Sequence, residues 1–258
     1  PAGEGRPGTR LIDVSKKEAF VSVIIPSKDN VPILKRCLET VIQTVQRVPY
    51  EIVIVDNGSS EDNREQITRE TERINQAISS EKSCLQKIRY LYRPMPFNFS
   101  HMCNLGAKEA EGNLLLFLND DIEAVSSGWM EELVDKALRE WTGAVGIKLL
   151  YPDSTRIQHA GVVNIVLGPV HKLQFQDDNG RYYDGRNQGV WNYLAVTGAC
   201  LMIRREVFEE AGGFEEQLQV AFNDVDLCFT LYELGYHNVV VNTVYLVHHE
   251  SLSRGHDE

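Results

Sequence analysis

The chain has 258 residues, enough to bury a sizeable core as one large α/β domain or two small ones. Its formal net charge of −11, with no basic stripe, argues against a nucleic-acid partner. No apolar run approaches the roughly 20 residues that a membrane span needs. The five cysteines are widely spread, without a CxxC pair or a disulfide framework, so we expect reduced thiols in a cytoplasmic protein.

The first half of the chain alternates short apolar strands with helices. Residues 1–19 predict a flexible tail or linker, and one domain is expected over 20–258. The first strand, over 21–25, is expected to stop at Pro26, and the next helix to take Asn30 as its N-cap. Further strands are predicted over 52–55, 88–92 and 114–118, and helices over about 61–80 and from a Ser100 cap to 110. This alternation predicts an α/β fold with right-handed crossovers and a mostly parallel sheet flanked by helices.

The strand over 114–118 ends in Asn119, Asp120 and Asp121. Its five large apolar residues are typical of a strand buried on both faces in the middle of a parallel sheet. Ligands of open α/β sheets collect outside the carboxyl ends of the strands, where this acidic pair would lie. Adjacent carboxylates repel unless a cation, a proton or hydrogen bonds compensate them, and Mg2+ or Mn2+ suits such oxygen ligands. A solvated turn that caps the next helix explains the triplet about equally well.

The second half of the chain changes to mixed β structure. A helix is predicted over 129–140, a strand over 144–149, and irregular β structure over 157–200 with a long polar loop at 176–188. Strands over 201–203 and 244–247 follow. The change suggests one continuous domain with a nucleotide-binding half at about 20–121 and an acceptor-binding half at about 122–258.

A second acidic cluster, Asn223-Asp224-Val225-Asp226, begins an amphipathic helix that ends at Gly235. Asn223 is a good N-cap, and Asp226 in the first turn interacts favourably with the helix dipole. Neither role accounts for Asp224, which the preceding loop could place over a pocket. A carboxylate beside a substrate hydroxyl would serve there as a general base.

His248 and His249 follow the strand over 244–247. Adjacent strand residues face opposite sides, so at most one of them is expected to point into a given site. A neutral imidazole could complete the coordination of a metal held by Asp121. A histidine at a strand end can also lie on the surface or behind the ligands without binding metal.

The familiar dinucleotide, P-loop and hydrolase-elbow motifs are absent from the chain. The segments that are present resemble, in their order, the family 2 glycosyltransferases, which are inverting enzymes with the GT-A fold. The resemblance covers roughly residues 20–255 and looks closest to bacterial enzymes that build O-antigens and related surface polysaccharides. It depends on residues 21–29 (VSVIIPSKD), 54–59 (IVDNGS), 104–107 (NLGA), 119–121 (NDD, in place of the DxD motif), 197–200 (TGAC), and 212–216 with 223–227.

The resemblance implies a group of residues around the nucleotide. The positions expected to line the base and ribose pocket are Pro26, Ser27, Asp29 and Asp56. Those expected to face the nucleotide or its phosphates are Arg93, Asn98 and Asn104, and those expected beside the ribose or metal are Asn119 and Asp120.

The resemblance also implies the metal site and the base. Asp121 would bind Mn2+ or Mg2+ bridging the diphosphate, with His248 as a further ligand and His249 as the alternative. Asp224 would deprotonate the acceptor hydroxyl. Asn119 replaces the first Asp of the motif, which removes one charge, and Asn223 stands where the family often has Glu.

The implied activity is transfer of a sugar from a UDP-, dTDP- or GDP-sugar to a hydroxyl of a glycan or lipid-linked acceptor, in bacterial cell-surface polysaccharide synthesis. A lipid-linked acceptor would place the protein at the inner face of the cytoplasmic membrane. One alternative is a sugar nucleotidyltransferase, although residues 26–30 lack the glycine-rich, basic loop that such enzymes need. Another is a non-catalytic sugar-binding module of a multidomain protein.

Overall fold

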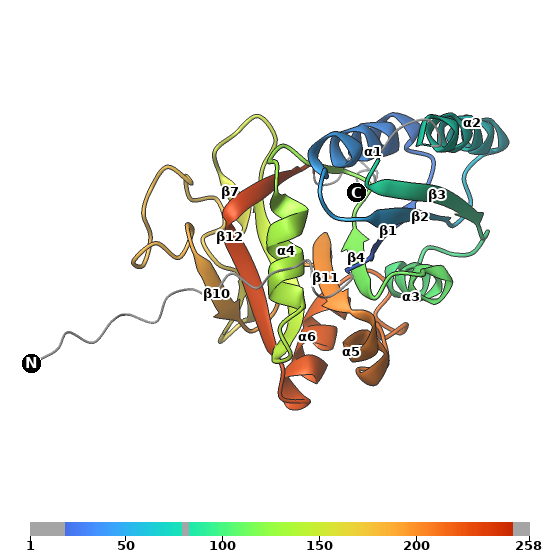
Figure 1. Ribbon diagram of the computed structural model, residues 1–258. Helices are drawn as coiled ribbons and strands as arrows, with labels where there is room; N and C mark the ends of the chain where they lie inside the picture. The colour runs from blue at the N-terminus through green and yellow to red at the C-terminus, as the bar shows by residue number, and fades with distance from the viewer. Residues whose placement is uncertain (1–18, 79–82, 250–258) are drawn as a thin grey trace, which may run out of the picture.

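The computed structural model describes residues 19–78 and 83–249, and these form three layers, with a large sheet between two layers of helices (Figure 1). Residues 1–18 of the expected tail lie outside the described residues, as do the last two residues of the helix predicted over 61–80. In the described part of the chain the sheet has ten strands.

The first half of the chain forms the parallel part of the sheet, in the order β4-β1-β2-β3. Its strands are β1 (Val21–Ser27), β2 (Tyr50–Asp56), β3 (Leu85–Tyr92) and β4 (Leu114–Leu118). The helices that connect them are α1 (Val31–Thr44), α2 (Glu61–Ile78) and α3 (Phe99–Glu109). The predicted alternation of strands and helices in this half is therefore confirmed.

The second half extends the same sheet beyond β4 with strands of both directions, in the order β4-β11-β6-β12-β10. These strands are β6 (Thr142–Leu150), β10 (Val190–Tyr193), β11 (Cys200–Arg204) and β12 (His237–His248). Two short strands, β5 (Ile122–Glu123) and β7 (Ile157–His159), pair with β12 and β6. A separate hairpin consists of β8 (Val162–Ile165) and β9 (Gly168–His171). The mixed β structure predicted for this half is present.

Helices cover both faces of the sheet (Figure 1). The helices α1, α2 and α4 (Trp129–Ala137) pack on one face, in a core that includes the fully buried Trp129. On the other face lie α3, α5 (Arg205–Glu210) and α6 (Asn223–Glu233), around Phe117 and Phe214. Because β4 contributes to both cores, all five of its residues are buried, as the apolar run predicts.

None of the helices in the described residues is long and apolar enough to cross a membrane. All five cysteines lie within the described parts of the chain, and none of them forms a disulfide.

Several predicted element ends are wrong, each for a local reason. Pro26 does not stop β1, because the ladder to β4 has already ended at Ile24, so the missing N–H is tolerated near the strand end. Asn30 is the N-cap of α1, as predicted, although its side chain makes no capping hydrogen bond. The cap of α3 is Asn98, whose Oδ1 accepts from the backbone N–H of His101 at 3.0 Å. Ser100 lies inside that helix.

The helix α6 begins one residue earlier than expected. Its N-cap is Phe222, in the left-handed conformation with φ of 64°, and Asn223 is the first helical residue. The side chain of Asn223 instead donates to the carbonyl of Leu218 and accepts from the N–H of Asp224. These bonds hold the loop before α6 against the helix start.

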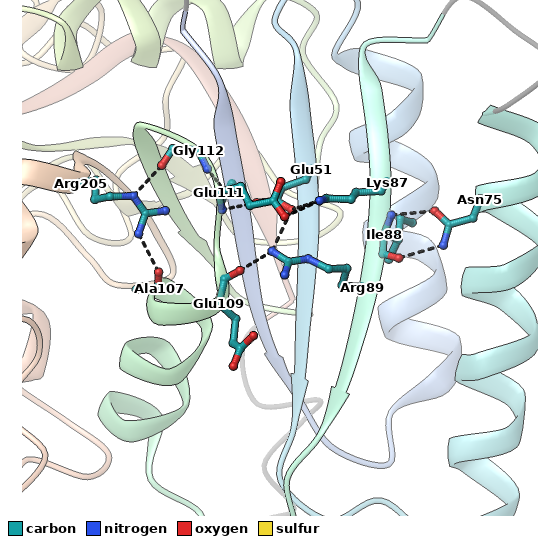
Figure 2. A network of polar contacts seen from close by, with 11 residues as sticks. Glu51, Asn75, Lys87, Ile88, Arg89, Ala107, Glu109, Glu111, Gly112 and Arg205 are labelled. Carbon is teal, nitrogen blue, oxygen red and sulfur yellow. Dashed lines mark hydrogen bonds and ion pairs between the residues drawn. The ribbon is translucent and has the colours of Figure 1, made fainter.

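A buried carboxylate joins the strands at the edge of the sheet opposite the acidic strand end. Glu51 of β2 has an exposed fraction of 0%. It accepts from the hydroxyl of Ser22 at 2.6 Å, from the backbone N–H of Glu111 at 2.6 Å and from the guanidinium of Arg89 at 2.9 Å (Figure 2). Arg205 of α5 donates to two backbone carbonyls beside this cluster, those of Ala107 and Gly112. The hydrogen bonds and the ion pair offset the cost of burying the charge.

We expect Glu51→Ala to lower the free energy of unfolding by about 3–5 kcal/mol, because removing one partner of a buried ion pair leaves the remaining charge and donors without compensation. Urea unfolding followed by circular dichroism measures the change. The matched control is Glu111→Ala, whose largely exposed carboxylate pairs with Lys87. That variant should unfold at nearly the same urea concentration as the parent chain. Equal stability of the two variants would contradict a structural role for Glu51.

Candidate active site

The carboxyl ends of the parallel strands bring the predicted polar residues to one edge of the sheet. Ser27 at the end of β1 pairs in register with Asp56 at the end of β2, and Asp56 with Tyr92 at the end of β3. Asp120 follows β4 on the other side of β1, and its Oδ2 accepts from the hydroxyl of Ser27 at 2.7 Å. This edge therefore gathers the loops that the sequence predicts to hold a ligand.

Asp120 is buried beneath the site. Burial raises the pKa of its carboxyl to about 7, and the hydrogen bond from Ser27 opposes that rise. The charge of the neighbouring Asp121 also raises this pKa, which is expected of two adjacent carboxylates.

Asp121 and His248 meet although 127 positions separate them in the chain (248 minus 121). The short strand β5 pairs antiparallel with the end of β12, so that Ile122 lies opposite His248. Nε2 of His248 is 3.0 Å from Oδ1 of Asp121 and 3.3 Å from Nδ2 of Asn119. The other ring nitrogen, Nδ1, is 2.7 Å from Oε1 of Gln158.

This pair fits the requirements of a divalent cation. The oxygen of Gln158 requires a proton on Nδ1 of His248, which leaves the lone pair of Nε2 directed toward Asp121 in the neutral ring. Oδ1 of Asp121 is buried and has no hydrogen-bond partner in the described residues. Two acceptors that face each other are compensated by a cation between them or by a second proton on the imidazole.

No group of three or more His, Cys, Asp or Glu side chains within the described residues is arranged to hold a metal. A cation at this place would therefore have two protein ligands, Asp121 and His248, and take its others from phosphate oxygens and water. That ligand set is typical of Mg2+ and Mn2+ bound with a nucleotide, where one or two side chains act together with substrate phosphates.

His249 points to the opposite side from His248. Its Nε2 is 2.9 Å from Oε2 of Glu123, which also forms a 2.8 Å ion pair with Arg36 of α1. The alternation of side chains along a strand explains why only one of the two histidines reaches Asp121. The alternative assignment of the metal ligand to His249 has no support in this geometry.

Gln158 is a positioning residue for His248 in this arrangement. We expect Gln158→Leu to weaken Mn2+ binding by about 10- to 100-fold, because a ligand histidine loses its tautomer and orientation when the acceptor behind it is removed. Isothermal titration with Mn2+ and the nucleoside diphosphate measures the effect. His249→Gln is the matched control and should leave Mn2+ affinity unchanged. A weaker effect for Gln158→Leu than for His249→Gln would refute the assignment.

Asp224 lies at the start of α6, and its carboxylate is held by the backbone on both sides. Oδ2 accepts from the N–H of Gly198 at 2.8 Å, and Oδ1 accepts from the N–H of Val225 at 2.8 Å. Burial raises the pKa of Asp224 above its ordinary value of 3.8, and these two hydrogen bonds limit the rise. A carboxylate that is fixed in place and more basic than usual is suited to accept a proton.

A single pocket of about 350 Å³ joins the two halves of the site. Asp224 and Gly198 line it, as do Asn119 and His248, and Asp121 lies in contact with the histidine. The hairpin β8–β9 closes one side with Val162 and His171. The structure therefore brings the predicted base and the predicted metal ligand His248 to one cavity.

The residues predicted around the nucleotide differ in exposure and in the groups that they contact. Asp29 is exposed and adopts φ of 56°, and its carboxylate accepts from the N–H of Ser60 and from Asn63. Asp56 is fully buried and accepts from the N–H groups of Gly58 and Ser59 and from the hydroxyl of Tyr90. Both thereby shape the loop at 57–60, and their contact with a nucleotide stays a prediction.

Pro26 is buried within β1, and Arg93 is exposed after β3. Two of the predicted nucleotide contacts join protein segments instead. Asn98 caps α3 and donates to the carbonyl of Glu216. Asn104 donates to the carbonyl of Phe214 and accepts from its N–H. These bonds dock α3 on the loop after α5, so we do not retain the two asparagines in the proposed site.

Three contributors to the site were not among the predicted site residues. Gln158 lies in β7, where the sequence predicted only irregular β structure, and Gly198 contributes a backbone N–H. His171 lines the pocket, with its Nδ1 2.9 Å from Nδ1 of the buried His159. Only the presence of two histidines in the region 157–171, His159 and His171 itself, could have drawn attention to it.

The comparison with protein families identifies one match, to glycosyl transferase family 2, over residues 22–212. Two relatives match nearly the whole chain. The uncharacterized protein y4gI of Sinorhizobium fredii is 39% identical over 93% of the chain, and the O-antigen biosynthesis protein RfbC of Myxococcus xanthus is 36% identical over 92%. The chain spans 25% and 18% of the length of these two proteins.

Solved structures share the fold at low sequence identity. The mannosyltransferase PcManGT of Pyrobaculum calidifontis, in complex with GDP-Man and Mn2+, has a TM-score of 0.65 and 16% identity over 93% of this chain and 59% of its own. GalNAc-T7 with UDP, GalNAc and Mn2+ has a TM-score of 0.70 and 19% identity over 89% of this chain and 44% of its own. The fold is thus the GT-A fold of glycosyltransferases, and the chain belongs to glycosyl transferase family 2.

Proposed function

We propose that the chain is a metal-dependent inverting glycosyltransferase that moves a sugar from a nucleoside diphosphate sugar to a hydroxyl of a glycan or lipid-linked acceptor. The observation that carries the proposal is the single pocket in which Asp224 and His248 lie together, with Asp121 against the histidine. Membership of the family supports sugar transfer in general.

In this proposal Asp224 accepts the proton of the acceptor hydroxyl. The acceptor oxygen forms a bond to the anomeric carbon, and the bond from that carbon to the diphosphate oxygen breaks, so the nucleoside diphosphate leaves with the electron pair. A single displacement inverts the anomeric configuration. The N–H groups of Gly198 and Val225 hold the carboxylate of Asp224 in one orientation for this step.

The donor diphosphate is assigned to the side of the pocket formed by Asn119, Asp121 and His248. A divalent cation held there by Asp121 and His248 would offset the charge that develops on the leaving diphosphate. The two solved structures compared above are named as complexes with Mn2+ and with GDP-Man or UDP, which supports Mn2+ and a nucleotide of this kind.

The acceptor is assigned to the side of the pocket formed by α6 and the hairpin β8–β9. The relative named for O-antigen biosynthesis supports an acceptor used in bacterial surface polysaccharide synthesis. A lipid-linked acceptor of that kind would bring the domain to the cytoplasmic face of a membrane.

A thermal-shift screen of UDP, dTDP, GDP and CDP, each with and without Mn2+, tests the donor site. A ligand that binds only the folded state at about 100 times its Kd adds about 2.7 kcal/mol of stability. For a domain of this size that corresponds to a rise in Tm of about 5–10 °C. We expect such a rise for one diphosphate, only with Mn2+.

The screen is paired with transfer measured from the matching nucleotide sugar. Stabilisation without any transfer to glycan acceptors would favour a sugar-binding module. Release of pyrophosphate from a nucleoside triphosphate and a sugar phosphate would favour a nucleotidyltransferase. Absence of a shift with every diphosphate would refute the proposed donor site.

A further inference from the structure

A second pocket, of about 460 Å³, lies on the other side of the hairpin β8–β9 from the candidate active site. Val162 of β8 and His171 of β9 line the first pocket, whereas the next residue after each, Val163 and Lys172, lines the second. Because neighbouring side chains of a strand point to opposite faces, the hairpin forms a thin wall between the two cavities. A chain-like ligand that passes the hairpin could reach both.

The second pocket is lined by cations that lack acidic partners. The ammonium of Lys172 lies 4.5 Å from the centre of the Tyr183 ring, and the guanidinium of Arg186 lies 4.1 Å from that of Trp191. Neither forms an ion pair with a carboxylate of the described residues. In a chain with a net charge of −11, two such cations at one cavity create a local field that attracts an anion.

The same pocket presents tyrosine rings. Tyr183 and Tyr232 line it with exposed fractions of 70% and 62%. Tyr193 also lines it and packs against Gly161, where a Cβ would lie 2.4 Å from the ring, so only glycine permits this position of the ring. Exposed aromatic faces next to polar groups are typical of binding surfaces. Flat rings of this kind suit the apolar face of a sugar.

The loop that carries Tyr183 is held in a strained conformation. Tyr183, Asp184 and Gly185 are consecutive left-handed residues, with φ of 46°, 61° and 87°. For the two residues that are not glycine this conformation is unfavourable, and it persists only where the surroundings fix it. Strain of this kind is concentrated at ligand sites.

Buried hydrogen bonds and an ion pair hold the loop in this conformation. The side-chain amide of Asn187, which is fully buried, donates to the carbonyl of Gly180 at 2.9 Å and lies 3.1 Å from Oδ1 of Asp178. The ammonium of Lys148 donates to the carboxylate of Asp178 at 2.7 Å and to the carbonyl of Asn187 at 2.9 Å. These contacts stabilise the loop conformation in which Tyr183 and Arg186 line the pocket.

We propose that this second pocket is a subsite for an anionic sugar unit of the acceptor glycan, with a carboxylate or phosphate bound by Lys172 and Arg186 and the ring stacked on the tyrosines. The inference rests on the proposed function, because it names the class of acceptor as an acidic glycan. The acceptor hydroxyl would lie at Asp224 and the anionic unit beyond the hairpin.

Equilibrium binding without any donor tests the subsite. The probes are a hyaluronan tetrasaccharide, which carries carboxylates, glucose 1-phosphate, and chitotetraose as the neutral control. The chain has three tryptophans, so its indole N–H region in a two-dimensional NMR spectrum contains three signals, and that of Trp191 reports on Arg186, whose guanidinium lies over its ring. We expect at least one anionic probe to shift this signal, and the more effective anion identifies carboxylate or phosphate as the ligand group.

The variants Lys172→Gln and Arg186→Gln should each weaken anion binding by about tenfold, and the exposed control Lys108→Gln should not. Circular dichroism melts confirm that each variant folds, and either variant suffices if the other does not fold. Binding of chitotetraose as tight as that of the anions, no shift at Trp191 with any probe, or unchanged affinity in both variants would overturn the subsite.

The proposed subsite and the proposed reaction are tested separately. Because no donor is present, anion binding is also measured in Asp224→Asn, where it should be unchanged. If that variant transfers sugar normally while Lys172→Gln loses anion binding, the assignment of the base is wrong and the subsite stands. If transfer depends on Asp224 and anions do not bind, only the subsite is refuted.

Discussion

Asp224→Asn is expected to transfer sugar about 10²- to 10⁴-fold more slowly than the parent chain, because a positioned general base contributes a factor of this size. The amide has nearly the shape of the carboxylate but cannot accept the proton of the acceptor hydroxyl. Initial rates at saturating donor and acceptor measure the loss. The Kd of the nucleoside diphosphate with Mn2+ should stay within about twofold, which separates loss of chemistry from loss of donor binding.

The control for this variant is Asp226→Asn. Asp226 is an exposed carboxylate in the same first turn of α6, so the change removes the same charge from the helix start. It should transfer sugar at nearly the parental rate. The asparagine at 224 also loses one of the two backbone hydrogen bonds, so the Tm of both variants is compared. A slow rate in both, or a normal rate in Asp224→Asn, would refute the base assignment.

The pH dependence of transfer provides an independent check on Asp224. Burial raises its pKa above 3.8, and the base is active only when it is ionised. The rate should therefore fall as pH decreases through the raised pKa, at a higher pH than for an exposed aspartate. The residual rate of Asp224→Asn should lack this acid limb. An identical acid limb in the variant would assign the titration to another group.

Asp121→Asn is the second change with a large expected effect. We expect the affinity for Mn2+ in the presence of nucleoside diphosphate to fall by more than about 100-fold, which exceeds the loss from removing a group behind a ligand. The reason is that, among the described residues, two side chains are available to the cation, and Asp121 provides the negative charge of the pair. Titration calorimetry with Mn2+ and diphosphate measures this, and the Mn2+-dependent rise in Tm should disappear.

Glu123→Gln is the control for Asp121→Asn. It removes a carboxylate two residues further along the chain, where Arg36 and His249 bind it, and should leave Mn2+ affinity unchanged while lowering Tm slightly. Equal loss of Mn2+ binding in the two variants would indicate a general effect of charge. Undiminished Mn2+ binding in Asp121→Asn would place the cation elsewhere.

The sequence predicted the centre of each parallel strand and both ends of β4, whereas β2 is longer at both ends than predicted. The run from Leu114 to Leu118 is recognisable because both faces of a central strand must be apolar. By the same criterion Glu51 interrupts the second strand, which was predicted from Ile52 but begins at Tyr50. The buried carboxylate of Glu51 is tolerated there because Arg89, Ser22 and the N–H of Glu111 donate hydrogen bonds to it. No local sequence pattern reveals these contacts.

Helix starts show the same limit. Ser100 and Asn223 have side chains suited to capping, and the structure uses Asn98 and Phe222 instead. The hydroxyl of Ser100 donates to the carbonyl of Leu218, and the amide of Asn223 donates to the same carbonyl. The bond of Ser100 joins residues far apart in the chain, and capping preference, which is a local quantity, does not predict it.

By itself the sequence determined which residues carry charge at strand and helix ends, and it thereby predicts Asp121 and Asp224 as the carboxylates of the site. Only the tertiary structure decided which groups meet them. Gln158 lies 90 residues from His248 in the chain, and Gly198 lies 26 from Asp224. Hydrophobic pattern and strand-end position are properties of neighbouring residues, whereas these contacts depend on the pairing of β7 and β12 with β6 and on the docking of α6. The physical reason is that long-range pairing follows from the packing of the whole sheet, which no single segment encodes.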